Sequence, residues 1–481
     1  MVNVEKNQYI LSSAELNLPN MRHFAKWNWH LYSDGLLKTN VLKNAANEDV
    51  VLIGYAFCTD EQDKKAEADI AAWDGADLIA LTRYWTGRWA LFTEHGFCTD
   101  AGSMMSAFYC TVDGKSYITS SLALLEQIRI THRVREQKLN STAWQILPET
   151  GFEGVKKLLC TQKLQLSNDG IRVVPHIWIK DYRTLNASKK AERLAKLLVN
   201  GVSNIHLHSR RRLYLALTGG KDSRLVLAAM LKSKVPFSAY TCEQDDISTW
   251  DVTVPKRLSK KYSFPYTYIK RPKQMNTDYL EDFERFNAGN AHGEDENFYS
   301  YKQFDALPRD AVIIRGGFFE AGQTYARSYA RADEHFRNDI ENCDLALKND
   351  ALQKKGLDEW LENTLIAPVD YIDIRDRYYL EQRVGGWGAS IEQALSINDF
   401  LSVQIANCAE LLSILLSCSS EERARLALSF EPIKILNEEL LREPFNSVTV
   451  VDRLKRAKKF LKSPVSKLKK AAVKVKLKIS T

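Results

Sequence analysis

One stretch, Leu213–Ala229, constrains the fold of this chain more than any other, and it reads LYLALTGGKDSRLVLAA. Its first five residues form an apolar run of the kind found in strands that are buried on both faces. A glycine-containing turn follows at 218–220, and the apolar side chains from Leu225 onward give a helical apolar face. Strand, glycine turn and helix in this order predict an anion-binding geometry at the start of the helix.

The residues of the turn supply the groups that such a site needs. Glycines let the backbone turn tightly, and the helix that follows presents unpaired N–H groups and the positive end of its dipole. The same stretch contains two hydroxyls, a lysine, and a carboxylate at Asp222 that suits Mg²⁺ held against phosphate oxygens. An ordinary strand–helix turn is the less favoured interpretation, because the motif is long and its context is right. Neither G-x-x-x-x-G-K-[ST] nor G-x-G-x-x-G is present.

Length and composition indicate a globular protein of two or three domains. The 481 residues are 45% hydrophobic and 26% charged, and no apolar run reaches the roughly 18–20 residues that span a bilayer. The first sixteen residues lack the basic and apolar segments of a secretory signal. The eight cysteines are scattered and form no C-x-x-C pair, which argues against zinc ribbons and a disulfide framework. We therefore expect a reduced, cytoplasmic location.

The positive charge of the chain is concentrated in residues 451–481. Twelve of the 67 Lys and Arg lie between Arg453 and Thr481, where there is no acid, which leaves 55 basic against 60 acidic residues elsewhere. Leu454, Ala457, Phe460 and Leu461 share one helical face of this tail. A basic amphipathic segment favours peripheral contact with an anionic membrane surface, and a solvated tail is the alternative. Nucleic acid is less favoured, because Phe460 is the one aromatic available for base stacking.

Residues 1–182 are predicted to form an antiparallel β-sandwich. The runs Val50–Phe57 and Gly87–Thr93 are strongly β-prone, and Leu164–Val174 with Pro175 is typical of a closing hairpin. The run Ser116–Leu122 leads into a helix. The segment Lys64–Leu81, between the first two runs, is helical in composition. Strands dominate and long helices are few, which favours packed antiparallel sheets.

Residues 183–450 are predicted to form a doubly wound parallel sheet. A junction helix with apolar positions from Ala191 to Val202 is expected to be capped by Ser188. After the turn, strands are expected at three further places and alternate with helices, which puts ligands at the carboxyl ends of the strands. The segment Asn398–Arg442 is expected to be largely helical, with a break near Pro432. The three further strands are Phe237–Cys242, Tyr266–Ile269 and Ala311–Ile314.

Several motifs together resemble one enzyme family. The run TGGKDSR is similar to the S-G-G-x-D-S loop of the ATP pyrophosphatases, which cleave ATP between the α and β phosphates. In the first domain TGRWALF, CTDAGSMMSAFY and ITSSLALL resemble the glutaminase-type domain that precedes the synthetase domain in asparagine synthetase and its relatives. The resemblance implies an α/β protein with an Ntn-like antiparallel sandwich followed by an adenine-nucleotide α-hydrolase-like domain.

The same resemblance implies that the first domain does not hydrolyse glutamine. The amidotransferases of the family need a cysteine at position two, whereas this sequence has Val2 there, and its nearest cysteine is Cys58. We therefore expect the first domain to be a structural partner of the second, with the nitrogen supplied as ammonia or an amine.

The resemblance also assigns roles in the second domain. Leu217 to Arg224 and Gly316 would bind ATP, together with Thr241, which opens the segment where the family contacts adenosine. Asp222 and Glu320 would hold Mg²⁺, while Gly317 stands where the family has its acid–base residue. Lys434 and Glu381 are candidates for catalytic groups, with a helix-face ion pair as the alternative for Glu381. The ATP-binding residues in the turn are Leu217, Thr218, Gly219, Gly220, Lys221, Asp222, Ser223 and Arg224.

The function implied is an ATP-dependent amide-forming ligase similar to the asparagine synthetase and β-lactam synthetase group. Its substrates would be a small-molecule or peptide carboxylate and an amine, whose identities the sequence leaves open. Arg315 and Arg327 are cations that would bind a carboxylate or pyrophosphate, or else pair with acids. A tRNA-modifying ATP pyrophosphatase and a nucleotide-binding scaffold with a decayed site are the alternatives.

Overall fold

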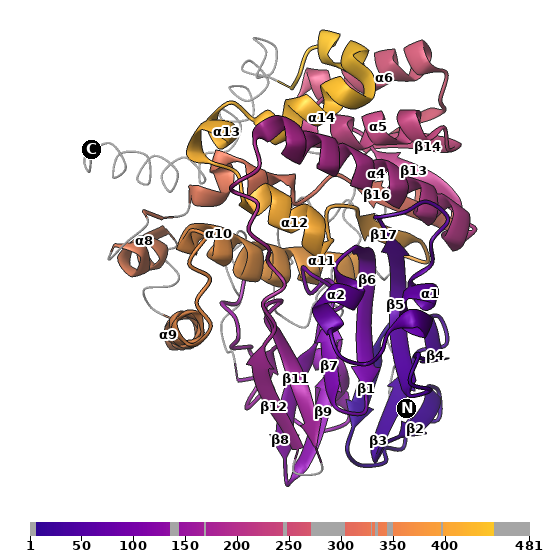
Figure 1. Ribbon diagram of the computed structural model, residues 1–481. Helices are drawn as coiled ribbons and strands as arrows, with labels where there is room; N and C mark the ends of the chain where they lie inside the picture. The colour runs from indigo at the N-terminus through magenta and orange to yellow at the C-terminus, as the bar shows by residue number, and fades with distance from the viewer. Residues whose placement is uncertain are drawn as a thin grey trace.

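The computed structural model places a β-sandwich beside an α/β domain (Figure 1). The sandwich consists of two six-stranded sheets, with orders β10-β8-β9-β1-β3-β2 and β12-β11-β7-β6-β5-β4, and every pairing in both is antiparallel. The antiparallel sandwich predicted from the sequence is confirmed. The residues that the structure describes are 6–134, 144–167, 170–243, 248–270, 304–328, 330–331, 335–343, 350–395 and 398–446. The strands are β1 Tyr9–Ser12, β2 Arg22–Lys26, β3 Trp29–Ser33, β4 Thr39–Lys43, β5 Asp49–Cys58, β6 Trp85–Thr93, β7 Gly96–Thr99, β8 Phe108–Val112, β9 Lys115–Thr119, β10 Lys156–Lys157, β11 Gln162–Ser167 and β12 Gly170–Pro175.

Alternating apolar residues of both sheets form the interior of the sandwich. Leu11 from one sheet and Ile53 and Phe92 from the other belong to the same buried cluster. The helix predicted over 64–81 is in fact two, α1 (Ala66–Ala72) and α2 (Leu78–Thr82). The helical conformation is interrupted between them at Gly75, whose φ of 93° does not occur in a right-handed helix. A further short helix, α3 (Leu122–Gln127), begins at the cap Ser121.

The α/β domain begins with the long helix α4 (Ala187–Ser209). Its N-cap is Asn186, whose side chain accepts a hydrogen bond from Lys189 N, and Ser188 lies inside the first turn. The prediction that Ser188 caps this helix is therefore wrong by two residues, because Asn is as good a cap as Ser and stands where the chain turns. The predicted domain boundary at 182 lies between β12 and α4.

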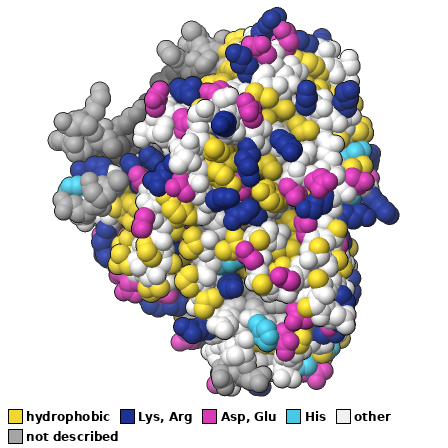
Figure 2. Space-filling view, viewed as in Figure 1, with side chains coloured by type: hydrophobic (Ala, Val, Ile, Leu, Met, Phe, Trp, Pro, Cys, Tyr) yellow, Lys and Arg dark blue, Asp and Glu magenta, His cyan; other side chains and the backbone are white. Residues whose placement is uncertain are grey.

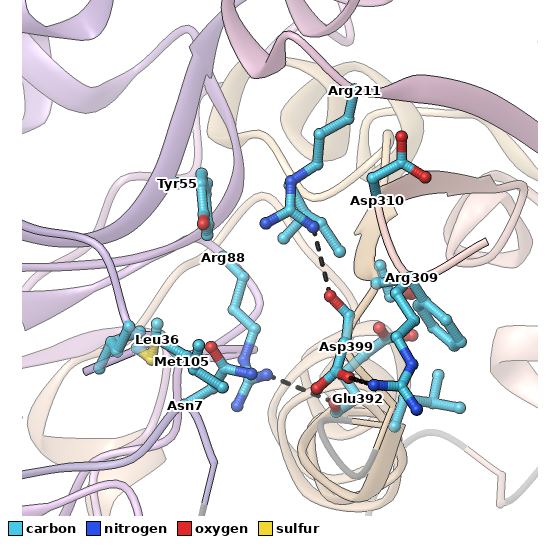
Figure 3. Close-up of a pocket in the computed structure, with 15 residues that line it drawn as sticks. Asn7, Leu36, Tyr55, Arg88, Met105, Arg211, Arg309, Asp310, Glu392 and Asp399 are labelled. Atoms are coloured by element: carbon cyan, nitrogen blue, oxygen red, sulfur yellow. Dashed lines mark hydrogen bonds and ion pairs between the residues drawn. The ribbon is translucent and has the colours of Figure 1, made fainter. Parts of the chain in front are cut away.

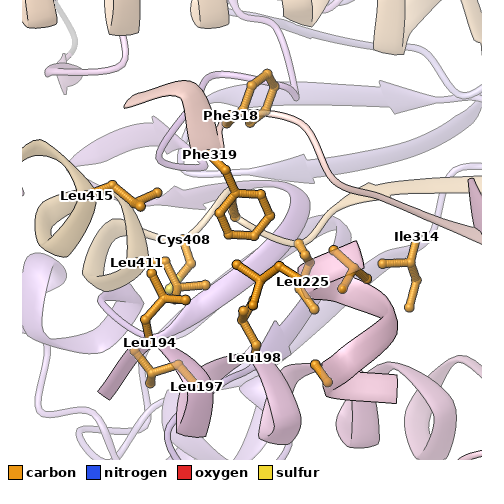
Figure 4. Close-up of a cluster of buried hydrophobic side chains, with 14 of the residues drawn as sticks. Leu194, Leu197, Leu198, Leu225, Ile314, Phe318, Phe319, Cys408, Leu411 and Leu415 are labelled. Atoms are coloured by element: carbon orange, nitrogen blue, oxygen red, sulfur yellow. The ribbon is translucent and has the colours of Figure 1, made fainter. Parts of the chain in front are cut away.

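A five-stranded parallel sheet forms the centre of the second domain, in the order β15-β14-β13-β16-β17. One face contributes Leu213, Leu215 and Ile314 to the core beneath α4, α5 and α14, and Figure 4 shows part of this cluster. The opposite face contributes Ile313 to a second cluster with α11. Helices thus cover both faces, and the doubly wound arrangement is confirmed. The elements are β13 Arg212–Ala216, α5 Lys221–Ser233, β14 Phe237–Cys242, α6 Thr249–Tyr262, β15 Tyr266–Ile269, β16 Ala311–Arg315, α11 Ala389–Ala394, β17 Leu401–Gln404 and α14 Ala427–Asn437.

The segment 398–442 differs from its predicted form. Its first part is the edge strand β17, which pairs with β16 from Val312↔Leu401 to Arg315↔Gln404. Pro432 does not interrupt the helix, contrary to the prediction, but lies inside α14. The helix tolerates it because only one backbone hydrogen bond within a helix of eleven residues is lost. The breaks occur instead on either side of α13 (Ser420–Ala424), which separates α14 from α12 (Ala409–Leu416).

In the described part of the chain, seven further helices complete the second domain. They are η2 (Phe319–Gly322), η3 (Thr324–Arg327), α8 (Phe336–Cys343), α9 (Ala351–Ile366), α10 (Ile374–Tyr378), a π-helix over Tyr379–Gly388, and η7 (Glu438–Arg442). None of the helices in the described ranges combines the length and the apolar character that a bilayer crossing requires. On the face shown in Figure 2, basic and acidic side chains are interspersed.

A buried asparagine joins the two domains. Asn407, just after β17, donates from Nδ2 to Gly87 O at 2.6 Å and to Asp100 Oδ1 at 2.8 Å, and its Oδ1 accepts from Gly102 N at 2.7 Å. All three partners belong to the sandwich. Because Asn407 and Asp100 are both fully buried, these bonds fix the end of β17 against the first domain.

Candidate active site

The glycine turn lies at the point where the strand order reverses. The chain runs from β13 to β14 and β15 on one side and then crosses to β16 and β17 on the other. The turn 217–220 after β13 and the loop 316–320 after β16 therefore flank the switch point, where ligands bind in open α/β sheets. The two segments touch, because a Cβ on Gly316 would lie 2.9 Å from the backbone of Asp222 and Ser223. Only glycine allows this approach.

Two hydroxyls shape the turn. Ser223 Oγ accepts from Thr218 N at 3.1 Å and lies 3.2 Å from Thr218 Oγ1. Thr218 Oγ1 in turn accepts from Gly220 N at 3.1 Å. Gly220 is the N-cap of α5 and supplies no side chain to cap it. The N–H groups of the first turn of α5 therefore lack a side-chain cap, and they are available to bind an anion.

One amide of the turn is bound by a carboxylate. Gly219 N donates to Asp251 Oδ1 at 2.9 Å, and the other carboxylate oxygen closes a capping box with Ser248 at the start of α6. A Cβ on Gly219 would lie 2.7 Å from Trp250 O, so the turn and the start of α6 are in direct contact. A phosphate oxygen reaches Gly219 N only after Asp251 moves.

The two predicted metal ligands lie within electrostatic reach of each other. Asp222 Oδ1 accepts from Gln323 Nε2 at 3.0 Å, and Glu320 Oε2 accepts from Tyr379 OH at 3.2 Å. Burial and then the charge of Glu320 raise the pKa of Asp222 to about 6, against the opposing effect of Lys221. Two carboxylates that repel each other at a ligand-binding edge suit a divalent cation.

The protein alone offers few ligands to that cation. No group of three or more His, Cys, Asp or Glu side chains that would hold a metal occurs among the described residues. Mg²⁺ commonly takes one or two carboxylates and completes its shell with phosphate oxygens and water. The donor set of Asp222 and Glu320 therefore fits Mg²⁺ that arrives with a nucleotide.

Three other predicted ATP-binding residues hold the backbone of the turn in place. Arg224 is buried and donates from Nη2 to Gly219 O at 2.9 Å, so its guanidinium is bound to the backbone of the turn. Thr241 Oγ1 donates to Leu217 O at 2.5 Å and accepts from Tyr266 OH at 2.9 Å. Leu217 is itself fully buried. These contacts fix the backbone of the turn.

The space at Gly317 is filled by another side chain. Gly317 N donates to Gln404 Oε1 at 3.0 Å, and a Cβ at this position would lie 2.6 Å from that oxygen. Gln404 Nε2 donates to Glu392 Oε1 at 2.7 Å, and the same oxygen accepts from Arg315 Nη1 at 2.6 Å. The sequence predicts no role for Gln404 or Glu392, because Gln404 falls in the segment predicted to be helical and no motif surrounds Glu392.

The two predicted catalytic candidates lie elsewhere. Glu381 is fully buried, forms the i,i+4 ion pair with Arg377 at 3.1 Å, and accepts from Trp360 Nε1 at 2.5 Å and from Thr161 Oγ1. These contacts match the alternative interpretation of Glu381 as a member of a helix-face ion pair. Lys434 is exposed on α14 and lies 3.9 Å from Glu438. No hydrogen bond or ion pair between described residues joins either side chain to the glycine turn.

The two predicted cations, Arg315 and Arg327, are paired with acids, and a third arginine for which the sequence predicted no role, Arg383, is not paired with any described acid. Arg315 pairs with Glu392, and Arg327 pairs with the buried Asp376 at 2.9 Å. Arg383 lies one helical turn from Tyr379 in the π-helix, with its guanidinium 3.5 Å above the Trp387 ring. It has no hydrogen bond or ion pair to another described residue. With about four to five residues per turn, the π-helix places 379, 383 and 387 on one face.

A separate cavity of about 560 Å³ lies between the domains (Figure 3). Asp310 and Leu401, at the amino ends of β16 and β17, line it, so it opens at the sheet edge opposite the glycine turn. Its arginines have partners: Arg211 donates to Asp399 O at 3.3 Å, and Arg88 Nη1 lies 3.4 Å from Glu392 O.

Comparison with known proteins adds little to this geometry. No family model and no curated protein matches the sequence. Among solved structures, NMN synthetase from Francisella tularensis is matched over 29% of this chain and 59% of its own, at 15% identity and a TM-score of 0.19. The chain thus spans about three fifths of that synthetase. Glutamine phosphoribosylpyrophosphate amidotransferase from B. subtilis, solved with ADP and GMP, is matched over 67% and 72%, at 8% identity and a TM-score of 0.22. TM-scores this low support no inference about function.

Proposed function

We propose that this chain is an ATP-dependent ligase that adenylates a carboxylate and transfers the acyl group to ammonia or an amine. The observation that carries the proposal is the uncapped N-terminus of α5 at the switch point, with Asp222 and Glu320 beside it. Helix amides bind phosphate, and a carboxylate pair binds the Mg²⁺ that accompanies it.

The chemistry is a displacement at the α-phosphate. A carboxylate oxygen of the substrate attacks that phosphorus, the bond to the bridging oxygen breaks, and pyrophosphate leaves an acyl-adenylate. The amine then attacks the acyl carbon and AMP leaves with the bonding electrons, while the amine proton passes to solvent. The first-turn amides of α5 and Lys221 orient the diphosphate and stabilise its charge. Mg²⁺, when bound by Asp222 and Glu320, neutralises further charge on the leaving group.

Arg383 is the cation that we assign to a substrate carboxylate. Its guanidinium is stacked on Trp387, and its edge carries N–H donors without an acceptor among the described residues. A planar guanidinium edge matches a carboxylate with two parallel hydrogen bonds. Tyr379, one turn away on the same face, contacts Glu320, so this face leads to the carboxylate pair.

A nucleotide-binding scaffold is the second candidate. Two observations favour it. Gln404 fills the space where the asparagine synthetases have an acid–base group. Asp251 accepts the hydrogen bond of Gly219 N, which a phosphate would otherwise receive. A carboxamide neither takes up nor releases a proton near neutral pH. An enzyme built this way relies on an amine that is already deprotonated.

Exchange of labelled pyrophosphate into ATP separates the two candidates. The purified full chain is incubated with MgATP and, in turn, with members of a panel of amino acids, dicarboxylates and short peptides. Exchange that requires one carboxylate supports the ligase, and amide formation on addition of ammonia or a small amine completes the assignment. Tight MgATP binding with no exchange across the panel supports the scaffold, and exchange that requires tRNA supports a tRNA-modifying enzyme.

We also propose a reduced, cytoplasmic protein whose residues 451–481 contact anionic lipid. The proposed compartment rests on the scattered cysteines of the sequence, which form no C-x-x-C pair. The twelve cations of the tail lie outside the described residues, so this part of the proposal comes from the sequence.

A further inference from the structure

The C-terminal end of the described chain passes directly over the glycine turn. We call residues 440–446 the C-terminal strap. Asn446 N donates to Gly219 O at 3.0 Å, so the strap joins the turn through the backbone. Arg224 Nη1 donates to Glu443 O at 2.8 Å and Nη2 donates to Pro444 O at 2.7 Å. The same guanidinium lies 3.8 Å from the ring centre of Phe445.

These contacts make the strap a fixed wall of the site. Arg224 is a buried cation whose nearest acceptors are backbone carbonyls of the turn and the strap. Removing the strap would leave that charge with Gly219 O alone among these acceptors, and losing the others is costly inside a protein. The ring of Phe445 also packs edge-on against Phe430 of α14, at 5.2 Å between centres.

The strap places one polar side chain at the start of α5. The carboxamide of Asn446 lies 3.7 to 3.9 Å from the point where a Cβ of Gly220 would stand, and Gly220 is the N-cap of α5. Asn446 is exposed, and its side chain makes no hydrogen bond to another described residue. Its Nδ2 is therefore a donor at the same helix end as the uncapped amides.

We propose that Asn446 is a ligand of the diphosphate of ATP, reaching it from the C-terminal strap. The inference rests on the proposed use of the turn for ATP. The first-turn amides of α5 approach the diphosphate from one side, and the carboxamide approaches it from the strap. Because Gly219 N is engaged by Asp251, a donor from outside the turn provides a contact that this amide does not. A hydrogen bond to a charged group of this kind is among the stronger ones.

Calorimetric titration tests the assignment with three probes: MgATP, magnesium pyrophosphate and adenosine. We expect N446A to weaken MgATP and magnesium pyrophosphate about tenfold, because one charge-assisted hydrogen bond is lost, and to leave adenosine binding unchanged. N446D should weaken both phosphate ligands further through repulsion, and N446Q should recover part of the affinity. The matched control is N17A, an exposed asparagine of the sandwich, which should bind all three probes as the parent does.

The outcomes separate this inference from the function on which it rests. The three variants at position 446 should fold, because Ala, Asp and Gln all keep the backbone N–H that bonds Gly219 O, and N17A changes only an exposed side chain. If the parent binds MgATP and pyrophosphate and N446A and N446D bind them equally well, Asn446 is not a ligand and the proposed function stands. An equal loss of adenosine affinity would also overturn the assignment. If the parent itself binds neither phosphate ligand, both proposals fail.

Discussion

Replacing Asp222 by asparagine should separate function from stability. This carboxylate is half-buried, is repelled by Glu320 and accepts a hydrogen bond from Gln323. Asparagine has the same shape and its amide oxygen keeps the bond to Gln323, but it carries no charge. We expect D222N to unfold at a higher temperature than the parent in EDTA while losing pyrophosphate formation.

The pKa of the carboxylate gives the size of the effect. Burial and the neighbouring charge move it from 3.8 to about 6. Each pKa unit corresponds to about 1.4 kcal/mol, so the ionised form is disfavoured by about 3 kcal/mol at pH 7.5. Residual repulsion and relaxation reduce this figure, and a gain of about 1 to 3 kcal/mol in the free energy of unfolding is the expected range.

The assay compares thermal unfolding with and without MgATP. The parent should gain stability when MgATP is added, since a ligand that binds only the folded state stabilises it by mass action. D222N should unfold at a higher temperature than the parent without MgATP, and its unfolding temperature should rise less when MgATP is added. D370N, which neutralises an exposed carboxylate, is the matched control and should behave as the parent in both conditions. Lower stability of D222N in EDTA, or undiminished pyrophosphate release, would refute the reasoning.

Three further perturbations test other parts of the structure. Burial lowers the pKa of His176 to about 4, so between pH 6.5 and 4 the unfolded chain binds a proton that the native chain does not. The free energy of unfolding should therefore fall by up to about 3 kcal/mol as the pH is lowered through this range. H176Q should flatten this part of the pH profile measured by denaturant unfolding. N407L should cost about 2 to 4 kcal/mol in urea unfolding, because Asp100 and Gly102 N each lose a buried partner, and an unchanged midpoint would contradict the role of Asn407 in joining the domains. Deleting 451–481 should abolish cosedimentation with phosphatidylserine vesicles, whereas the full chain should bind them at 0.1 M salt, release them at 0.5 M salt, and ignore neutral phosphatidylcholine vesicles.

Local signals in the sequence were sufficient for most of the fold. The strand, turn and helix at 213–229 are encoded by neighbouring residues, and β14 occupies the predicted range Phe237–Cys242. The edge strand β17 was missed because its four residues gain their pairing from β16, about 90 positions earlier in the chain. Pro432 was misjudged for a related reason: packing of α14 against α4 and α5 outweighs one lost hydrogen bond.

The site was predictable only where one segment supplies it. Asp222 and the turn come from the motif itself. Asp251, Gln404 and Asn446 lie 32, 87 and 227 residues from the glycines that they contact. None of these three lies in a recognisable motif. Gln404 has one retrospective signal, since a glycine in place of a side chain at 317 implies that another group fills the space.

Asp251 connects the phosphate end of the site with the helix that follows β14. Its carboxylate has two tasks at once, because one oxygen binds Gly219 N and the other closes the capping box with Ser248. A diphosphate at the first turn of α5 brings negative charge toward that carboxylate and competes for the same amide. In D251N the one remaining oxygen keeps the contact with Ser248, which is the N-cap of α6, while the NH₂ group that faces Gly219 N cannot accept from it. The substitution therefore removes both the repulsion and the competition for this amide. We therefore expect D251N to bind magnesium pyrophosphate several-fold more tightly than the parent. Weaker binding would show that the carboxylate assists the phosphate site rather than competing with it.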